Sequence, residues 1–134
     1  MAQTAHKSLP LILAREFASN IATPVTVMDE QGRLVFFNEP AERLLGRRQA
    51  EVGELAPHDW SQIFRVERLD GGEVRLDDMP VGIAHRQRCP AHDTLAFTTP
   101  AGDRHNIEVT AFPLLGRDEG YFGVVAVFWE VRDE

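Results

Sequence analysis

The sequence predicts an α+β domain: a five-stranded antiparallel sheet with short helices on its inner face and an N-terminal helix outside it. Two strand-rich regions predict this class. Residues 25–46 have the pattern of a strand, a turn, a second strand and a helix. From residue 93 onward, apolar residues again recur with the period of two that is typical of strands. Helical and loop-like segments lie between these two regions.

The first strand region predicts a hairpin that leads into a capped helix. The run VTVM at residues 25–28 alternates as in a strand with one buried face, and residues 34–37 form a second apolar and aromatic run. Asn38 can accept a hydrogen bond from an unpaired backbone N–H at the start of the following helix. Gly46 is typical of the residue just beyond a helix end.

A helix is predicted over residues 8–21, ahead of the hairpin. Leu9, Leu13, Phe17 and Ile21 recur every four residues, which places them on one stripe of the helix. Two interpretations remain open. The helix packs on its own sheet, or its surplus apolar residues form a contact between two copies of the chain. In the second case the dimer-interface residues are Leu9, Leu13 and Phe17.

The middle of the chain predicts short helical turns and one longer helix. Glycine and proline interrupt residues 51–64, where Trp60 is expected in the core. Asp77 or Asp78 can cap a helix that runs to about Arg88.

Three strands are predicted after this helix. Residues 95–97 and 107–111 alternate, with turn residues between them and a loop before the last run. The last run, residues 121–131, is almost wholly apolar. A strand without polar alternation is expected to be covered on both faces.

Two stretches of the chain resemble the PAS domain family. They are VTVMDEQGRLVFFNEPAERLLG from residue 25 and RVERLDGGEVRLDDMPVGIAHRQ from residue 65. The resemblance spans about residues 23–131 and implies the PAS order of two strands, helices and three strands. We therefore divide the chain into an N-terminal helix or cap, residues 1–22, and a PAS-like domain, residues 23–134.

The resemblance also implies a function. PAS domains are sensory modules of bacterial signalling proteins, so we expect binding and not turnover. A small apolar or amphipathic molecule, or a cofactor, would lie between the sheet and the helix holding residues 81–85. Its signal would pass through a homodimer or a partner such as a kinase or regulator. The candidate ligand-binding residues are Val27, Phe37, Leu45, Ile83, His85, Phe97 and Val109.

The resemblance suggests two candidate cofactors, haem and flavin. Some haem-binding relatives supply the iron ligand from the helix that contains His85, whose imidazole can ligate iron or sense pH. The alternative is a partly exposed or core-edge histidine that is hydrogen-bonded to backbone. Cys89 does not match the cysteine motif of relatives that bond flavin covalently. Noncovalent flavin would need polar residues on the sheet, for which Asn106 and Thr110 are candidates.

Composition limits the partners. The formal charge of −7 disfavours nucleic-acid binding. With Cys89 as the single cysteine, the chain has no intrachain disulfide or multi-thiolate metal site, as in a reducing compartment. The apolar run at residues 9–14 is too short to span a membrane. We therefore expect a cytoplasmic protein without a membrane segment.

Catalytic motifs are not found. The chain has no phosphate-binding glycine loop, nucleophile elbow or HExxH motif, and we expect no enzyme activity. Two other functions remain open. One is a protein-interaction module without a ligand, which would use its sheet face and residues 9–17. The other is an enzyme of the ketosteroid-isomerase type with an aspartate and a histidine as acid and base, although that fold places several helices before its sheet.

Overall fold

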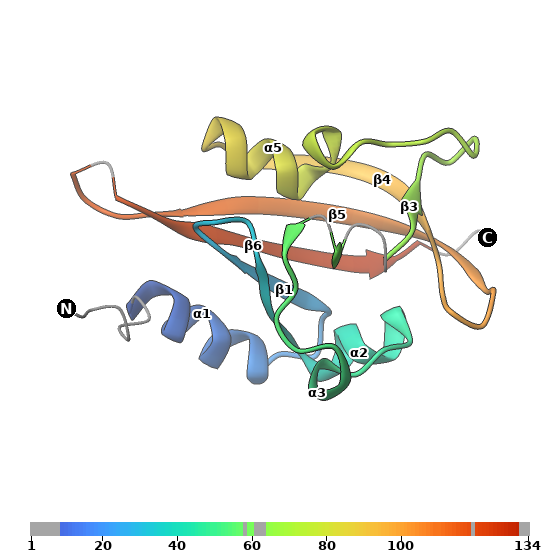
Figure 1. Cartoon of the computed structure of the whole chain (residues 1–134), viewed down its shortest axis with the longest axis horizontal. Helices are drawn as coiled ribbons and strands as arrows, with labels where there is room; N and C mark the ends of the chain where they lie inside the picture. The colour runs from blue at the N-terminus through green and yellow to red at the C-terminus, as the bar shows by residue number, and fades with distance from the viewer. Residues whose placement is uncertain (1–8, 58, 61–63, 119, 132–134) are drawn as a thin grey trace.

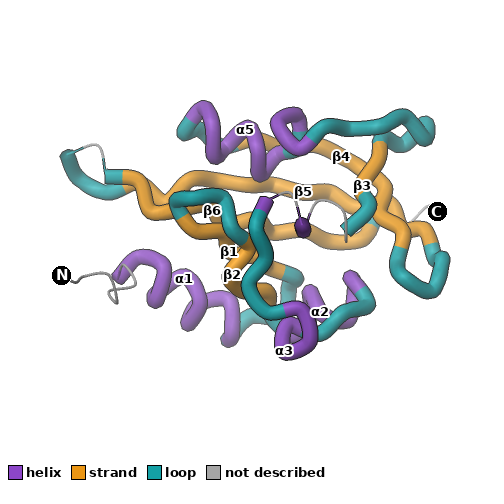
Figure 2. Tube along the Cα trace, viewed as in Figure 1, coloured by secondary structure: helices purple, strands orange, loops and turns teal. Residues whose placement is uncertain are grey.

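The computed structural model describes residues 9–57, 59–60, 64–118 and 120–131. Within these residues, six strands form one antiparallel sheet in the order β2-β1-β6-β5-β4-β3. Figures 1 and 2 show α5 on one side of this sheet and α1 on the other. The elements are α1 (Leu9–Ser19), β1 (Val25–Asp29), β2 (Leu34–Phe37), α2 (Glu39–Leu45), α3 (Gln49–Val52), β3 (Val66–Glu67), the 3₁₀ turn η1 (Leu76–Asp78), α5 (Pro80–Gln87), β4 (Ala91–Thr98), β5 (Arg104–Leu115) and β6 (Tyr121–Glu130).

The predicted α+β class is confirmed, and the sheet has one strand more than the five predicted. The additional strand, β3, pairs with β4 at the edge of the sheet, where Val66 lies opposite Phe97. Because β3 has only two residues, it is too short to show a period of two. The N-terminal helix is present as α1, while its predicted start at Ser8 lies outside the described residues.

The turn between β1 and β2 is held by Asp29 and Gly32. Gly32 has a φ of +82°, a left-handed conformation that suits glycine. The Asp29 carboxylate accepts hydrogen bonds from the backbone N–H groups of Gln31 and Arg33 and from Arg33 Nε. This local network fixes the predicted hairpin.

Asn38 joins three elements of the fold. Its Oδ1 accepts from Ala41 N, which caps α2 as predicted, and from Val25 N of β1. Its Nδ2 donates to the carbonyl oxygens of Ala18 in α1 and of Thr23. The residue is only 2% exposed, so protein groups and not water satisfy its amide. Asn38 therefore fixes where α1 and α2 lie relative to β1.

The start of α5 differs from the prediction. Asp77 and Asp78 do not cap it but belong to η1, and no side chain caps the helix. Pro80, its first residue, has no N–H, which leaves one donor fewer for a cap to satisfy. Gly82 lets η1 lie directly against α5, since a Cβ there would be 2.0 Å from Leu76 O.

Two apolar clusters lie on opposite faces of the sheet. The outer cluster, under α1, consists of Leu11, Ala14, Ala18, Val25, Val27 and Val125. The inner cluster lies between the sheet, α5, α2 and the segment before β3. Its buried members are Met28, Leu34, Phe37, Ala41, Leu45, Trp60, Phe64, Val74, Met79, Ala84, Leu95, Phe97, Ile107, Val109, Ala111, Val124, Ala126 and Phe128.

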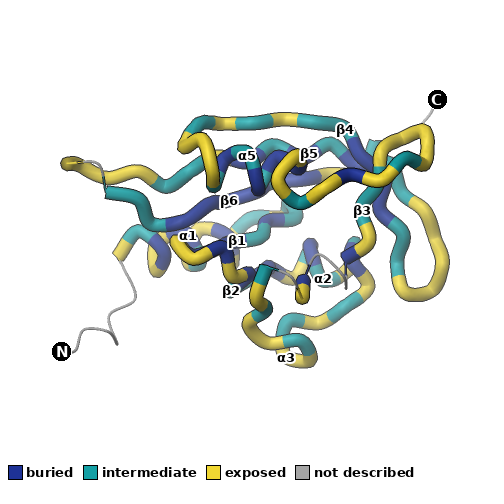
Figure 3. Tube along the Cα trace, turned by 45° about the horizontal axis from the view of Figure 1, so that its top comes forward, coloured by how far each residue is buried: buried dark blue, intermediate teal, exposed yellow. Residues whose placement is uncertain are grey.

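The central strand β6 contributes to both clusters. It pairs with β1 on one side and β5 on the other. Val124, Ala126 and Phe128 belong to the inner cluster, whereas Val125 belongs to the outer cluster and Val127 packs against it. Figure 3 shows this stretch of β6 largely in the dark blue of buried residues. The prediction that the last strand is covered on both faces is confirmed.

Candidate functional site

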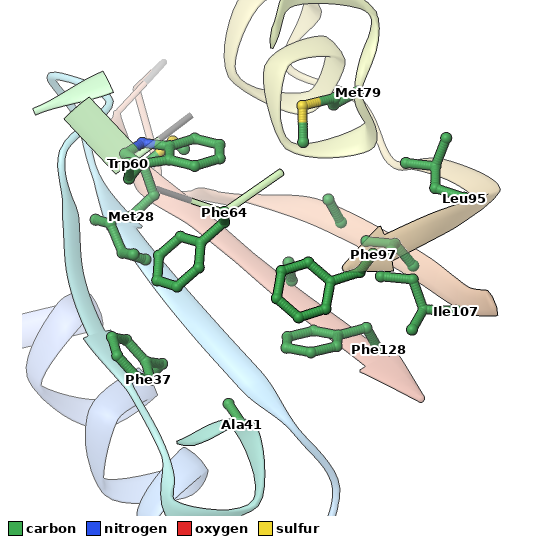
Figure 4. Packing of buried hydrophobic residues seen from close by; sticks show 14 of the residues in the cluster. Met28, Phe37, Ala41, Trp60, Phe64, Met79, Leu95, Phe97, Ile107 and Phe128 are labelled. Carbon is green, nitrogen blue, oxygen red and sulfur yellow. The ribbon is translucent and has the colours of Figure 1, made fainter. Parts of the chain in front are cut away.

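An apolar cavity of about 90 Å³ lies within the inner cluster, between the sheet and the start of α5. Figure 4 shows aromatic and methionine side chains converging on this region from the sheet and from α5. The sheet strands contribute through their inward-facing positions, and Met79, Pro80 and Val81 contribute from the α5 side. Almost all of the lining is hydrocarbon, aromatic ring or thioether. The site is therefore suited to a neutral ligand.

Three of the predicted ligand-binding residues line this cavity: Leu45, Phe97 and Val109. Phe37 is buried in the inner cluster but does not reach the lining. Its ring packs edge to face against Phe64, with centroids 6.0 Å apart, and Phe64 itself lines the cavity. Ile83 is half-buried on α5 and lies outside the lining.

Val27 lies on the opposite face of the sheet from the one predicted. It is fully buried in the outer cluster, under α1. Because side chains alternate along a strand, its neighbours Thr26 and Met28 face the cavity instead. The sequence pattern could not distinguish these faces, since both sides of β1 are covered by the fold.

His85 also lies outside the cavity lining. Its Nδ1 makes a short hydrogen bond with the hydroxyl of Tyr121, at the start of β6. The guanidinium of Arg88 stacks on the Tyr121 ring, 3.4 Å from its centroid. His85, Arg88 and Tyr121 thus form a cluster that attaches the C-terminal end of α5 to β6. His85 is thus a partly buried, hydrogen-bonded histidine, as in the alternative, but its partner is a side-chain hydroxyl and not the predicted backbone group.

The environment of His85 favours its neutral form. Burial lowers the pKa of His85, and the nearby charge of Arg88 lowers it further, while Asp29 and Asp77 act in the opposite direction. Burial is also the main reason that the pKa of Tyr121 is raised. The two groups are therefore hydrogen-bonded as neutral partners near pH 7.

Haem and flavin do not fit this site. Pockets for drug-sized ligands measure roughly 300–1,000 Å³, well above the cavity of about 90 Å³. His85 is engaged by Tyr121 outside the lining. The candidate flavin contacts Asn106 and Thr110 alternate with the inward-facing residues of β5 and so face the outer side of the sheet.

Trp60 is in the core, as predicted, and it also lines the cavity. Its Nε1 donates to the carbonyl oxygen of Gly32 over 3.3 Å, which joins the segment before β3 to the first hairpin. Sequence reasoning did not assign Thr26, Met28 or Met79 to the site. The alternation along the first strand assigned Thr26 and Met28 to the face opposite Val27. Met79 was expected near the start of the helix that Asp77 or Asp78 would cap.

A second candidate surface lies on α1. Leu11, Ala14 and Ala18 pack on the sheet. The predicted dimer residues Leu9, Leu13 and Phe17 are 63%, 57% and 55% exposed, and Ile12 beside them is 43% exposed. We call these four residues the α1 patch. The helix is thus apolar on two opposite sides, and the described residues of the chain cover only one of them.

The described part of the chain has neither a metal-binding cluster nor a membrane-spanning helix. Its histidine, cysteine and acidic side chains form no group of three or more that could hold a metal ion. The described helices are all too short or too polar to cross a lipid bilayer.

Comparisons with known proteins point to one family. A family model for the PAS domain matches residues 22–133. The PAS domain of a protein from Colwellia psychrerythraea is 16% identical with a TM-score of 0.64, over 90% of this chain and 96% of that one. The PAS domain of nitrogen regulation protein NR(II) from Vibrio parahaemolyticus is 17% identical with a TM-score of 0.62, over 92% of this chain and 99% of that one.

A LOV protein has a similar fold. The LOV protein of Rhodobacter sphaeroides is 14% identical with a TM-score of 0.73, over 93% of this chain and 69% of that one. At these identities the likeness concerns the fold alone. The search of curated proteins finds no match.

Proposed function

The chain belongs to the PAS domain family, and we propose that it senses a small molecule held in the cavity between the sheet and α5. The family is sensory and regulatory, and its structural neighbours include PAS domains of signalling proteins. The observation that carries the proposal is the apolar cavity within an otherwise close-packed inner cluster. We propose no reaction for the chain, and its PAS fold argues against the ketosteroid-isomerase alternative.

The arrangement of α5 supports a route for the signal. Met79, Pro80 and Val81 at the start of α5 line the cavity, and His85 one turn later bonds to Tyr121 of β6. A ligand that displaces the start of α5 acts on the same rigid helix that holds this bond. A ligand can shift the conformation only if it binds one arrangement of α5 more tightly than the other.

Strand β6 connects the cavity with the outer face of the sheet. Val124 and Ala126 line the cavity, while Val125 between them contacts the outer cluster under α1. A change in the position of β6 therefore affects the surface on which α1 rests. We propose that the signal reaches α1 through this strand.

The α1 patch is the proposed contact with a second copy of the chain. Its four large apolar side chains lie side by side on an exposed helix face, which is typical of an interaction surface. We propose a homodimer in the cytoplasm that passes its signal to a protein such as a kinase or regulator.

A ligand-free interaction module is the second candidate function. Two observations favour it: the cavity of about 90 Å³ is small for a ligand site, and the α1 patch is an exposed apolar surface. In this case the patch binds its partner constitutively, and the cavity is a packing defect of the inner cluster.

The first experiment is an absorption spectrum of freshly purified protein, followed by mass spectrometry of small molecules released on denaturation. The sensor proposal predicts a released small molecule and no Soret or flavin band, because neither cofactor fits the cavity. A colourless protein that releases nothing would favour the ligand-free module. A Soret or flavin band would contradict the cavity described above.

The dimer is tested with Leu13→Glu. We expect the mass from light scattering to fall from dimer to monomer, because a carboxylate cannot be buried without a partner in an apolar contact. The fold should remain, since Leu13 is 57% exposed and surface changes usually alter stability by about 0.5 kcal/mol or less. Glu16→Leu, on the same exposed side of α1, is the control: it adds no charge to the contact and should leave the mass at that of a dimer. An unchanged mass for Leu13→Glu would exclude the α1 patch as the contact.

A further inference from the structure

Thr26 is the only hydroxyl-bearing residue among the described residues that line the cavity. It lies on β1 between Val25 and Val27, both fully buried on the outer face, and it is itself half-buried on the inner side. The other polar group of the lining, Trp60 Nε1, already donates to Gly32 O. The Thr26 hydroxyl is thus the polar group of the lining that a ligand can engage.

Between described residues, no hydrogen bond engages the Thr26 hydroxyl. A hydroxyl in apolar surroundings without a partner is unfavourable, whereas valine has the same shape and no such requirement. A ligand with a complementary polar group can therefore engage the Thr26 hydroxyl without breaking a hydrogen bond between described residues.

The remainder of the lining restricts the body of the ligand. None of the described residues that line the cavity is charged, so an ionised ligand would lose its hydration without a counter-ion among them. A cavity of about 150 Å³ in another protein holds benzene, and the present cavity of about 90 Å³ is smaller. Met28 and Met79 line it from opposite sides, and their flexible thioether chains can move to admit a ring of that size.

We propose that the cavity binds a neutral, benzene-sized or smaller molecule with one hydroxyl group, which exchanges a hydrogen bond with Thr26. This inference rests on the proposed sensor function and names the class of ligand for its site. Phenol is the simplest probe of this class. Benzene has the same ring without the hydroxyl and is the matched control.

The two lining methionines allow the binding to be observed directly. The chain has three methionines, Met1, Met28 and Met79. In full-length protein labelled with ¹³C at the methionine methyl groups, phenol should shift the signals of Met28 and Met79. Titration of these shifts gives a dissociation constant for each probe.

The variant Thr26→Val tests the hydrogen bond. We expect phenol to bind about tenfold more weakly, the change that corresponds to loss of one neutral hydrogen bond. Benzene should bind within about twofold of its wild-type affinity, because valine preserves the shape of the side chain. Thr26→Ser retains the hydroxyl and should keep most of the phenol affinity, which separates the hydrogen bond from a general effect of substitution at this site. The urea midpoint of each variant checks that it is folded.

The outcomes separate this inference from the proposed function. If both probes bind and Thr26→Val leaves the phenol affinity unchanged, the role of Thr26 is wrong and the sensor proposal stands. If neither probe shifts Met28 or Met79, the ligand class inferred here is wrong, and the sensor proposal then depends on the small molecule released on denaturation. If Thr26→Val weakens phenol binding tenfold and leaves benzene binding unchanged, the role of Thr26 and the sensor proposal are both supported.

Discussion

The inner and outer clusters on the two faces of the sheet differ in the side chains that fill them. The outer cluster is built mainly of alanine and valine, small side chains that let α1 approach the sheet closely. The inner cluster combines aromatic rings with methionine and leucine from many separate segments, and it contains the cavity. Large rings of fixed shape leave gaps that small branched side chains do not. The same sheet thus has one rigid face and one face able to adapt to a ligand.

The largest expected effect on the free energy of unfolding comes from truncating Asn38, which fixes α1 against the sheet on the outer face. Asn38→Ala deletes four hydrogen bonds, of 2.9 to 3.0 Å, that join α1, β1 and α2. At about 1 kcal/mol for each bond, and more for groups left buried without a partner, we expect a loss of roughly 3–4 kcal/mol. Urea unfolding of the variant measures this loss.

Asn106→Ala is the matched control for Asn38→Ala. Asn106 is half-buried on the outer side of β5, away from both clusters. Its truncation should reduce the free energy of unfolding by about 1 kcal/mol or less. Equal losses for the two variants would show that Asn38 does not hold the helices on the sheet.

The next effect compares the two faces by adding volume to each. Ala18→Leu adds atoms to a fully buried position under α1 and should destabilise the protein by about 1–3 kcal/mol. Ala126→Val places added methyl groups at the cavity and should be neutral or stabilise by about 0.5–1 kcal/mol. Thermal and urea unfolding of both variants give the comparison. A similar cost at the two sites would mean that the inner face packs as tightly as the outer.

The smallest expected effect is on the pH dependence of the free energy of unfolding, through His85 at the C-terminal end of α5. Because burial and Arg88 lower the pKa of His85 in the folded protein, the unfolded chain binds its proton more readily. The contribution of His85 to stability is therefore present above its ordinary pKa of about 6.5 and is lost as pH falls through the folded value. Unfolding free energies measured between pH 7.5 and 5 should fall less steeply for His85→Gln than for the wild type.

Tyr121→Phe sharpens this test. It removes the hydroxyl bonded to His85 but keeps the ring on which Arg88 stacks. Since burial is the main cause of the lowered pKa of His85, the pH dependence should persist in this variant. Parallel pH profiles for the wild type and His85→Gln would contradict a perturbed histidine at this position.

Local chemistry explains which parts of the fold could be predicted. Asn38 accepts a bond at the start of α2, and Gly46 ends that helix with a φ of +76°. Gly32 and Gly102 take positive φ values in the predicted turns. Each feature depends on neighbours within a few residues, so the residue type alone indicates the conformation.

Long-range contacts explain the predictions that were wrong or incomplete. Val27 was assigned to the pocket, although it lies under α1, because alternation gives two faces without saying which helix covers which. Strand β3 exists through its pairing with β4, far along the chain. His85 lies on the predicted helix, but its partner Tyr121 is 36 residues away, and only the fold decides that it binds there and not in the cavity.

By itself, then, the sequence determined the α+β class, the PAS resemblance, the capped helix after the hairpin and an apolar last strand. Those properties follow from residue periodicity and from hydrogen bonds over short distances. Only the tertiary structure decided which face of β1 meets the cavity, how small that cavity is, and that Thr26 carries the one hydroxyl among its described lining residues. Side chains from β1, α5, β5 and β6 line the cavity together. Its volume is the space that these side chains leave unfilled, so it depends on how the segments pack and not on the sequence of any one of them.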